Sequence, residues 1–258
     1  MKVFLINLPR STTRLARVSA RLEALGVSWE RLEAIDDAEL APSERGRRFS
    51  AFGWWCCTLA PPVHGQIGCA LSHQKAYRKI IEEGLPFACV LEDDVVLDDR
   101  FPEVLTWVES HLERTSPQVV LLCDHDGGAQ KVVPDIGLEP ATWDWCAEGY
   151  VLTRSAAEAL LADNSPLRVM NDTWSRWVDQ GVIRLFHARP TVCTQVSFDH
   201  PETSEIARCQ RVCDLSSTGR FFWRVKRVIG VTLDALSSSR RFRGACVLFV
   251  RRLKQWVG

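Results

Sequence analysis

The chain has 258 residues, of which 46% are hydrophobic and 25% are charged, and these values exclude intrinsic disorder and a coiled coil. Its 32 basic and 32 acidic residues balance, but ten basic residues and one acid lie in 220–258, which leaves 1–219 acidic. We therefore expect a catalytic domain over 1–219 and a basic tail over 220–258 that suits an anionic partner.

The ten cysteines include no C-x-x-C pair, which argues against a zinc ribbon. Several of them, including Cys69, Cys89 and Cys123, stand inside apolar runs, where a thiol behaves as a small hydrophobe. The apolar run at the N-terminus is too short for a signal peptide, so we expect reduced thiols and a cytoplasmic location.

Strands and helices alternate along the first 219 residues, which predicts an α/β fold with a mostly parallel central sheet. Short apolar runs predict strands at 3–6, 29–35, 87–91, 119–123, 150–152 and 183–186. Helical spacing predicts helices at 12–25, 68–83, 101–112, 155–162 with Ser155 as the cap, and 172–178. Residues 36–65, rich in Arg, Trp and Pro, are expected to be an irregular insertion.

An acidic triplet, Glu92-Asp93-Asp94, directly follows the predicted strand at 87–91. Three carboxylates at the end of a buried strand are costly unless something neutralises them, and open α/β sheets bind ligands at this end. Mg²⁺ or Mn²⁺ would solve the charge problem and leave positions for substrate phosphates. The alternative is a solvated acidic turn that caps the next helix.

Three sequence segments, taken in their order along the chain, resemble a known family. They are residues 6–10 with Arg14, residues 65–73, and residues 90–95, followed by weaker similarity as far as residue 206. In this order and spacing the chain resembles glycosyltransferase family 25, the lipooligosaccharide galactosyltransferases and their collagen-modifying relatives. The resemblance implies a GT-A-like fold, a UDP-sugar donor (most often UDP-galactose), a glycan or glycolipid acceptor, and transfer with inversion.

The resemblance also implies Mn²⁺ or Mg²⁺ between Asp94 and the diphosphate, with Glu92 as a further ligand or, like Asp93, near the ribose or sugar. Other segments supply further candidates for binding the donor. Asn7 and Leu8 end the first strand, where they could border the uracil, and Arg10 and Arg14 suit phosphate; the alternative for the arginines is solvation. Ser72 and His73 follow Gly68, which permits close backbone approach, and His73 is either a donor contact or a structural histidine.

Inverting transfer requires a general base on the acceptor hydroxyl. Asp172 is the first candidate and Glu148 the second, followed by Asp124 and Asp126. The alternative role of Asp172 is an N-cap. Trp174 and Trp177 either stack on an acceptor sugar or pack in the core, and His200 is a further candidate metal ligand. Residues 46–64 match no family pattern and are interpreted as an acceptor-side lid or a partner surface.

The tail over 220–258 carries apolar and basic residues at helical spacing, which suits the anionic inner face of the cytoplasmic membrane. Its longest apolar run, 244–250, is too short to span a bilayer. The alternative is a helix packed on the domain. No motif indicates nucleic-acid binding.

Two other functions compete with glycosyl transfer. A nucleotidyltransferase also gathers carboxylates around metal, but it normally needs a Gly-rich phosphate loop, which is not seen after the first strand. The other competitor is a non-catalytic descendant that holds partners at a membrane. The donor sugar, the linkage and the oligomeric state stay open.

Overall fold

A computed structural model describes residues 1–58, 60–62, 65–124, 135–144 and 147–195 of the chain. Its main sheet has seven strands, and five of them run in the same direction. The order across the sheet is β2 (Trp29–Glu33), β1 (Lys2–Asn7), β3 (Phe87–Glu92), β7 (Gly149–Thr153), β5 (Gln118–Leu121), β8 (Arg184–Arg189) and β6 (Gly137–Ala141). Only β7 and β6 run against the others, so the predicted α/β class with a mostly parallel sheet is confirmed.

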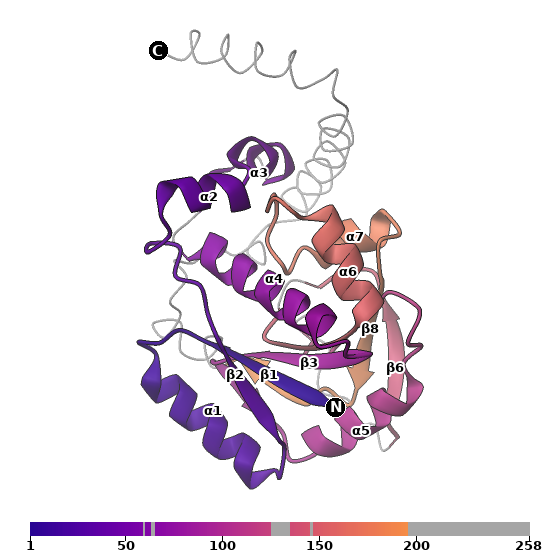
Figure 1. The fold of residues 1–258 in the computed structure, drawn as a ribbon. Coiled ribbons are helices and arrows are strands. Elements are labelled where there is room, and N and C mark those ends of the chain that lie inside the picture. The colour runs from indigo at the N-terminus through magenta and orange to yellow at the C-terminus, as the bar shows by residue number, and fades with distance from the viewer. Residues whose placement is uncertain (59, 63–64, 125–134, 145–146, 196–258) are drawn as a thin grey trace, which may run out of the picture.

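Helices cover both faces of the sheet (Figure 1). Helices α1 (Thr12–Ala24) and α5 (Phe101–His111) lie on one side, and α4 (Gln66–Glu82), α6 (Arg154–Asp163) and α7 (Trp174–Asp179) lie on the other. Strands β1, β3 and β5 are therefore almost wholly buried, as their continuous apolar runs predicted. Helices α1 and α4 are followed by Gly26 and Gly84, whose positive φ values of 67° and 65° end each helix.

Three short strands escaped the sequence-based prediction. Strands β4 (Val95–Leu97) and β9 (Cys193–Gln195) pair with each other outside the main sheet and have three residues each. Strand β6 lies at the edge of the main sheet and contains Pro140, which is a residue that interior strands avoid. The predicted cap of α6 was also wrong, because Thr153 rather than Ser155 accepts the hydrogen bond from the Ala156 amide, at 3.2 Å.

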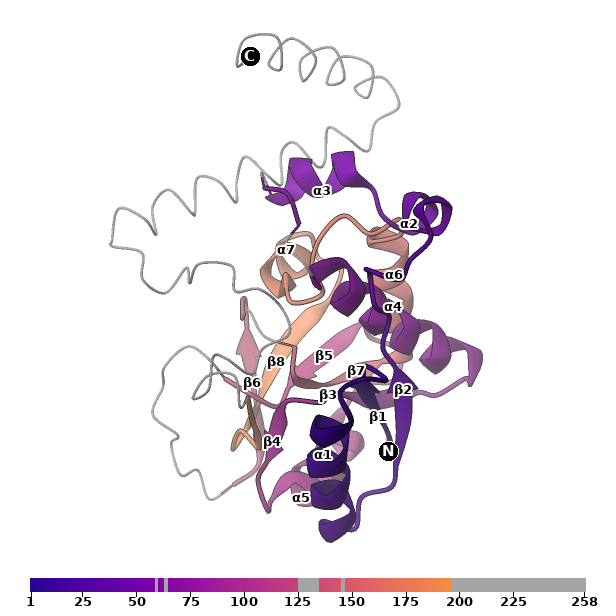
Figure 2. The ribbon, with the colours of Figure 1, turned by 90° about the vertical axis from the view of Figure 1, so that its left-hand side faces the viewer.

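The expected irregular insertion contains two short helices, α2 (Pro42–Arg48) and α3 (Ala51–Thr58). They lie beyond α4, on the side away from α1 (Figure 2). Trp54 is buried in a second, smaller core with Ile67, Leu71 and Leu167, while Trp55 is 42% exposed. Part of the insertion therefore belongs to the hydrophobic core. The prediction of an irregular segment missed this.

Gly68 tests how tightly α4 packs on the segment after β2. A Cβ at Gly68 would overlap the backbone oxygen of Ile35 and lie 3.0 Å from the amide nitrogen of Asp37. We expect Gly68→Ala to lower the free energy of unfolding by about 1–3 kcal/mol, measured by urea denaturation. Gly46→Ala is the control, because its Cβ would meet nothing within 4 Å and helical alanine is favoured. Equal effects of the two substitutions would contradict this packing.

Candidate functional site

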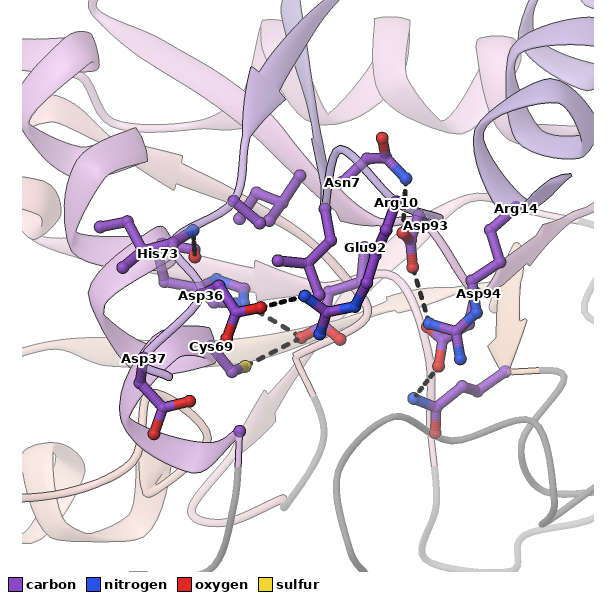
Figure 3. A pocket seen from close by; sticks show the side chains of 17 residues that line it. Asn7, Arg10, Arg14, Asp36, Asp37, Cys69, His73, Glu92, Asp93 and Asp94 are labelled. Carbon is purple, nitrogen blue, oxygen red and sulfur yellow. Dashed lines mark hydrogen bonds and ion pairs between the residues drawn. The ribbon is translucent and has the colours of Figure 1, made fainter. Parts of the chain in front are cut away.

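A pocket opens where β1 and β3 end, and it is bordered by the residues after β2 and the first turns of α4 (Figure 3). It brings together nine predicted binding residues: Asn7, Leu8, Arg10, Arg14, Ser72, His73, Glu92, Asp93 and Asp94. It also contains side chains that the sequence analysis did not single out for binding: Asp36, Asp37, Cys69 and Gln195. Asp36 and Asp37 closely follow β2, so the rule that selected the triplet could have found them.

Asp93 serves to join the walls of the pocket. Its carboxylate accepts hydrogen bonds from Asn7 Nδ2 at 2.7 Å and from Arg14 Nη1 at 2.9 Å. The Arg17 guanidinium also donates to its backbone oxygen, at 3.2 Å. Burial raises the pKa of Asp93 even though Asn7 and Arg14 lower it. Its contacts hold the end of β1 and the start of α1 against the triplet.

Of the three carboxylates in the triplet, that of Asp94 has its negative charge least neutralised by neighbouring groups. It is 6% exposed, and its Oδ2 accepts a hydrogen bond from Gln195 Nε2 at 2.9 Å. Its Oδ1 is buried and has no hydrogen-bond partner within the part of the chain that the structure describes. Burial and then the charge of Glu92 raise the pKa of Asp94 to about 7. A buried oxygen beside another carboxylate is chemically suited to a divalent cation.

Glu92 is oriented by a chain of buried side chains. His73 Nε2 lies 3.0 Å from Glu92 Oε1, and His73 Nδ1 lies 2.7 Å from the Tyr150 hydroxyl, which donates to Tyr77 at 3.1 Å. His73 is therefore a structural histidine that also reaches a pocket carboxylate. Cys69 Sγ lies 3.9 Å from Glu92, and burial raises the pKa of its thiol, which disfavours the metal-binding thiolate.

The two arginines lie on different sides of the pocket. Arg14 pairs with Asp93, whereas Arg10 forms an ion pair with Asp36 and keeps half of its side chain exposed. Asn7 is fully engaged, because its Oδ1 also accepts a hydrogen bond from Arg31 Nε at 3.1 Å. Arg10 is thus the more accessible of the two cations at the mouth of the pocket.

The two candidate bases, Glu148 and Asp172, lie near Glu92 but are not among the residues that line the pocket. Glu148 is buried, and its backbone oxygen accepts a hydrogen bond from the Glu92 amide at 2.8 Å. Asp172 is half-buried, and burial, followed by the charge of Glu92, raises its pKa to about 7; Asp144 and Glu148 add to the increase. The N-cap of α7 is Thr173, so the alternative role of Asp172 as the cap was wrong.

Trp174 and Trp177 are 0% and 1% exposed, so the packing alternative holds and neither ring can stack on an acceptor sugar. Trp177 Nε1 donates to Asp163 at 2.9 Å. Asp126, His200 and the tail over 220–258 lie outside the described residues.

A second group of possible metal ligands lies further along the same sheet. Asp124, Asp144 and His187 each place a donor atom within 4.8 Å of the others, and a divalent metal is compatible with this set. Asp124 was the third candidate base, while Asp144 and His187 were missed because no sequence motif links them.

Comparisons with known proteins agree with the motifs. Residues 1–125 match the model of a family described as Glycosyltransferase family 25 (LPS biosynthesis protein). The chain is 25% identical to lacto-N-neotetraose biosynthesis glycosyltransferase LgtE of Neisseria meningitidis over 224 residues, which cover 76% of this chain and 74% of the relative.

Two further relatives share shorter regions. Procollagen galactosyltransferase 2 of Homo sapiens is 25% identical over 63% of this chain, which spans only 28% of that protein. Lacto-N-neotetraose biosynthesis glycosyltransferase LgtB of Neisseria gonorrhoeae is 29% identical over 47% of this chain and 43% of its own length.

In the described ranges, every helix is too short or too polar to cross a bilayer.

The buried carboxylate of Asp94 gives a prediction about stability. A pKa raised above its ordinary value means that the folded protein binds this proton more tightly than the unfolded chain. The metal-free protein should therefore lose stability as pH rises from about 4 to 7. We expect Asp94→Asn to flatten this loss and to stabilise the metal-free protein at pH 8 by about 1–3 kcal/mol.

Thermal and urea unfolding in chelator across this pH range measure the effect. Asp99→Asn is the control, because Asp99 pairs with Arg21 and its side chain is 89% exposed. An Asp94→Asn protein that is destabilised at pH 8 would contradict the desolvated carboxylate.

Proposed function

We propose that this chain, which belongs to glycosyltransferase family 25 as its motifs predicted, transfers a sugar from a nucleotide-sugar donor to a glycan acceptor. The family and the names of the relatives indicate a glycosyltransferase. We further propose UDP-galactose as the donor, because one relative is named a procollagen galactosyltransferase. A lipooligosaccharide acceptor agrees with the family description and with the relative LgtE.

The single observation that supports this function best is the buried Oδ1 of Asp94 inside a pocket that also carries Arg10 and Arg14. A nucleoside diphosphate brings negative charge that neither buried carboxylates nor water can compensate there. Mn²⁺ or Mg²⁺, held by Asp94 and Glu92, would supply charge neutralisation for the departing diphosphate. Arg10, whose side chain is half exposed at the mouth of the pocket, would bind a phosphate in exchange for part of its pairing with Asp36.

The nucleoside is proposed to rest against Ile6 and Leu8, the apolar part of the lining at the end of β1. The amide of Asn7 is engaged by Asp93, Ser11 and Arg31, so its role is to shape the pocket. His73 and Ser72 act in the same way, because His73 orients Glu92 and the Ser72 hydroxyl accepts a hydrogen bond from the Ile35 amide at 2.8 Å. The donor side is therefore held rigid before substrate binds.

Asp172 is the proposed general base. Its pKa of about 7 lets it hold the proton of an acceptor hydroxyl at neutral pH, and ordinary aspartates are too weak as bases for this task. Glu148 is the second candidate. The neighbouring charges of Glu92, Asp144 and Glu148 help to set this basicity.

Docking of the tail over 220–258 on the anionic inner face of the membrane stays a prediction, as does the domain boundary at residue 219. A bound tail would bring the enzyme to a lipid-linked acceptor.

Donor binding is tested by calorimetry with a set of UDP-sugars, with and without Mn²⁺. We expect UDP-galactose binding to strengthen with Mn²⁺, and Asp94→Asn to weaken the Mn²⁺-dependent part by roughly tenfold or more. Asp99→Asn should bind as the wild type does. A folded protein with no affinity for any UDP-sugar would favour the non-catalytic alternative, and release of pyrophosphate would favour the nucleotidyltransferase.

The role of Asp172 is tested by transfer kinetics. We expect Asp172→Asn to lower kcat by about 10²–10⁴-fold with little change in donor affinity, because a base acts after the donor has bound. Wild-type kcat/KM should rise with pH up to about 7, where Asp172 loses its proton. Asp179→Asn, at an exposed position in α7, is the control. An unchanged kcat in Asp172→Asn would show that Asp172 is not the general base and would favour Glu148.

A further inference from the structure

Asp124, Asp144 and His187 meet from three separate parts of the chain. His187 lies in β8 and pairs in register with Leu121, the last residue of β5. Asp124 follows β5, and Asp144 follows β6. Because Asp124 and His187 lie at the carboxyl end of β5, the group lies at the same edge of the sheet as the donor pocket, but it shares no residue with that pocket.

The group is largely removed from water. The side chains of Asp144, His187 and Asp124 are 2%, 8% and 11% exposed. His187 Nε2 lies 3.1 Å from Asp144 Oδ2, and His187 Nδ1 lies 3.6 Å from Asp124 Oδ2. The imidazole therefore stands between two carboxylates, one on each ring nitrogen.

The contact between His187 and Asp144 is unusual. Although the two atoms are 3.1 Å apart, Nε2 is buried and forms no hydrogen bond with any described residue, Asp144 included. Two ligands bound to one metal at about 2.1 Å lie roughly 3.0–3.4 Å apart for right-angled to tetrahedral geometry. The spacing matches a ligand pair.

Asp124 lies beside the His187 ring, where it would orient the His187–Asp144 pair. Arg189 Nη1 lies 2.7 Å from Asp124 and Arg189 Nε lies 2.6 Å from Glu139, so Asp124 is already engaged in an ion-pair network. Arg189 Nη2 is also 3.4 Å from His187 Nδ1. A guanidinium only donates, so Nδ1 accepts from Arg189 in this structure, and Asp124 lies 3.6 Å away on the same side of the ring. A histidine that binds metal through Nε2 carries its proton on Nδ1, so metal binding would require Nδ1 to exchange the Arg189 contact for donation to Asp124.

We propose that Asp144 and His187, oriented by Asp124, form a second cation site that binds a divalent transition metal. Imidazole favours transition metals, and the carboxylates favour Mn²⁺ or Zn²⁺ among them. The nearby carboxylates Glu148 and Asp172 make the surroundings more negative. A bound ion would link the end of β5 and strand β8 to the segment after β6. This site does not depend on the proposed glycosyl transfer.

The test is a titration of the full-length, nucleotide-free protein with Mn²⁺, in which electron paramagnetic resonance counts the free ion. Mn²⁺ is chosen because it avoids the cysteine thiols. We expect His187→Gln and Asp144→Asn to lose one bound ion per chain, and Asp124→Asn to bind it about 10–100-fold more weakly. His111→Gln, which changes an exposed histidine of α5, should bind as the wild type does.

A thermal readout accompanies the count. Mn²⁺ should raise the Tm of the wild type, of His111→Gln and of Asp94→Asn, and should do so less in His187→Gln. Asp94→Asn should retain the second ion, which separates this site from the donor pocket. If His187→Gln does not fold, Asp144→Asn decides. Equal stoichiometry and affinity in the wild type and the folded site variant would overturn the proposal and leave His187 as a structural residue between two aspartates.

Discussion

The structure depends on the accumulation of negative charge at one edge of a buried sheet. Strands β3 and β5 end there, and β7 begins there because it runs in the opposite direction. Burial, followed by the negative charges of Glu92 and Glu148, raises the pKa of both Asp94 and Asp172 to about 7. Such an edge is stable only when a bound cation neutralises the carboxylates or when some of them are protonated.

The donor half of the site was predictable from sequence because its residues directly follow apolar strands. Glu92, Asp93 and Asp94 come after β3, and Asn7 comes at the end of β1, so adjacent parallel strands bring them together. The different roles of these residues within the site were not predictable from sequence. The sequence cannot reveal that Arg14 and Asn7 donate to Asp93 while one oxygen of Asp94 receives no hydrogen bond from any described residue, because these contacts depend on how α1 packs.

The rest of the site depends on long-range pairing. Gln195 and His187 reach the sheet edge through β9 and β8, and Asp144 follows an edge strand that contains proline, so no local pattern identified them. The tryptophans beside Asp172 were ambiguous for a similar reason. Their spacing suits either a surface platform or a core, and only the tertiary packing, with the rings of Trp174 and Trp177 in an edge-to-face arrangement, decides for the core.

The small core around Trp54 couples two regions that lie far apart in the chain. Leu167 packs in that core, its amide donates to the Arg48 oxygen at 2.7 Å, and its oxygen accepts from the Ser50 amide at 2.9 Å. Leu167 also precedes Asp172 by only five residues. Evolutionary change in the insertion is thus transmitted to the segment that carries Asp172, so the two segments are expected to diversify together when the enzyme acquires a new acceptor.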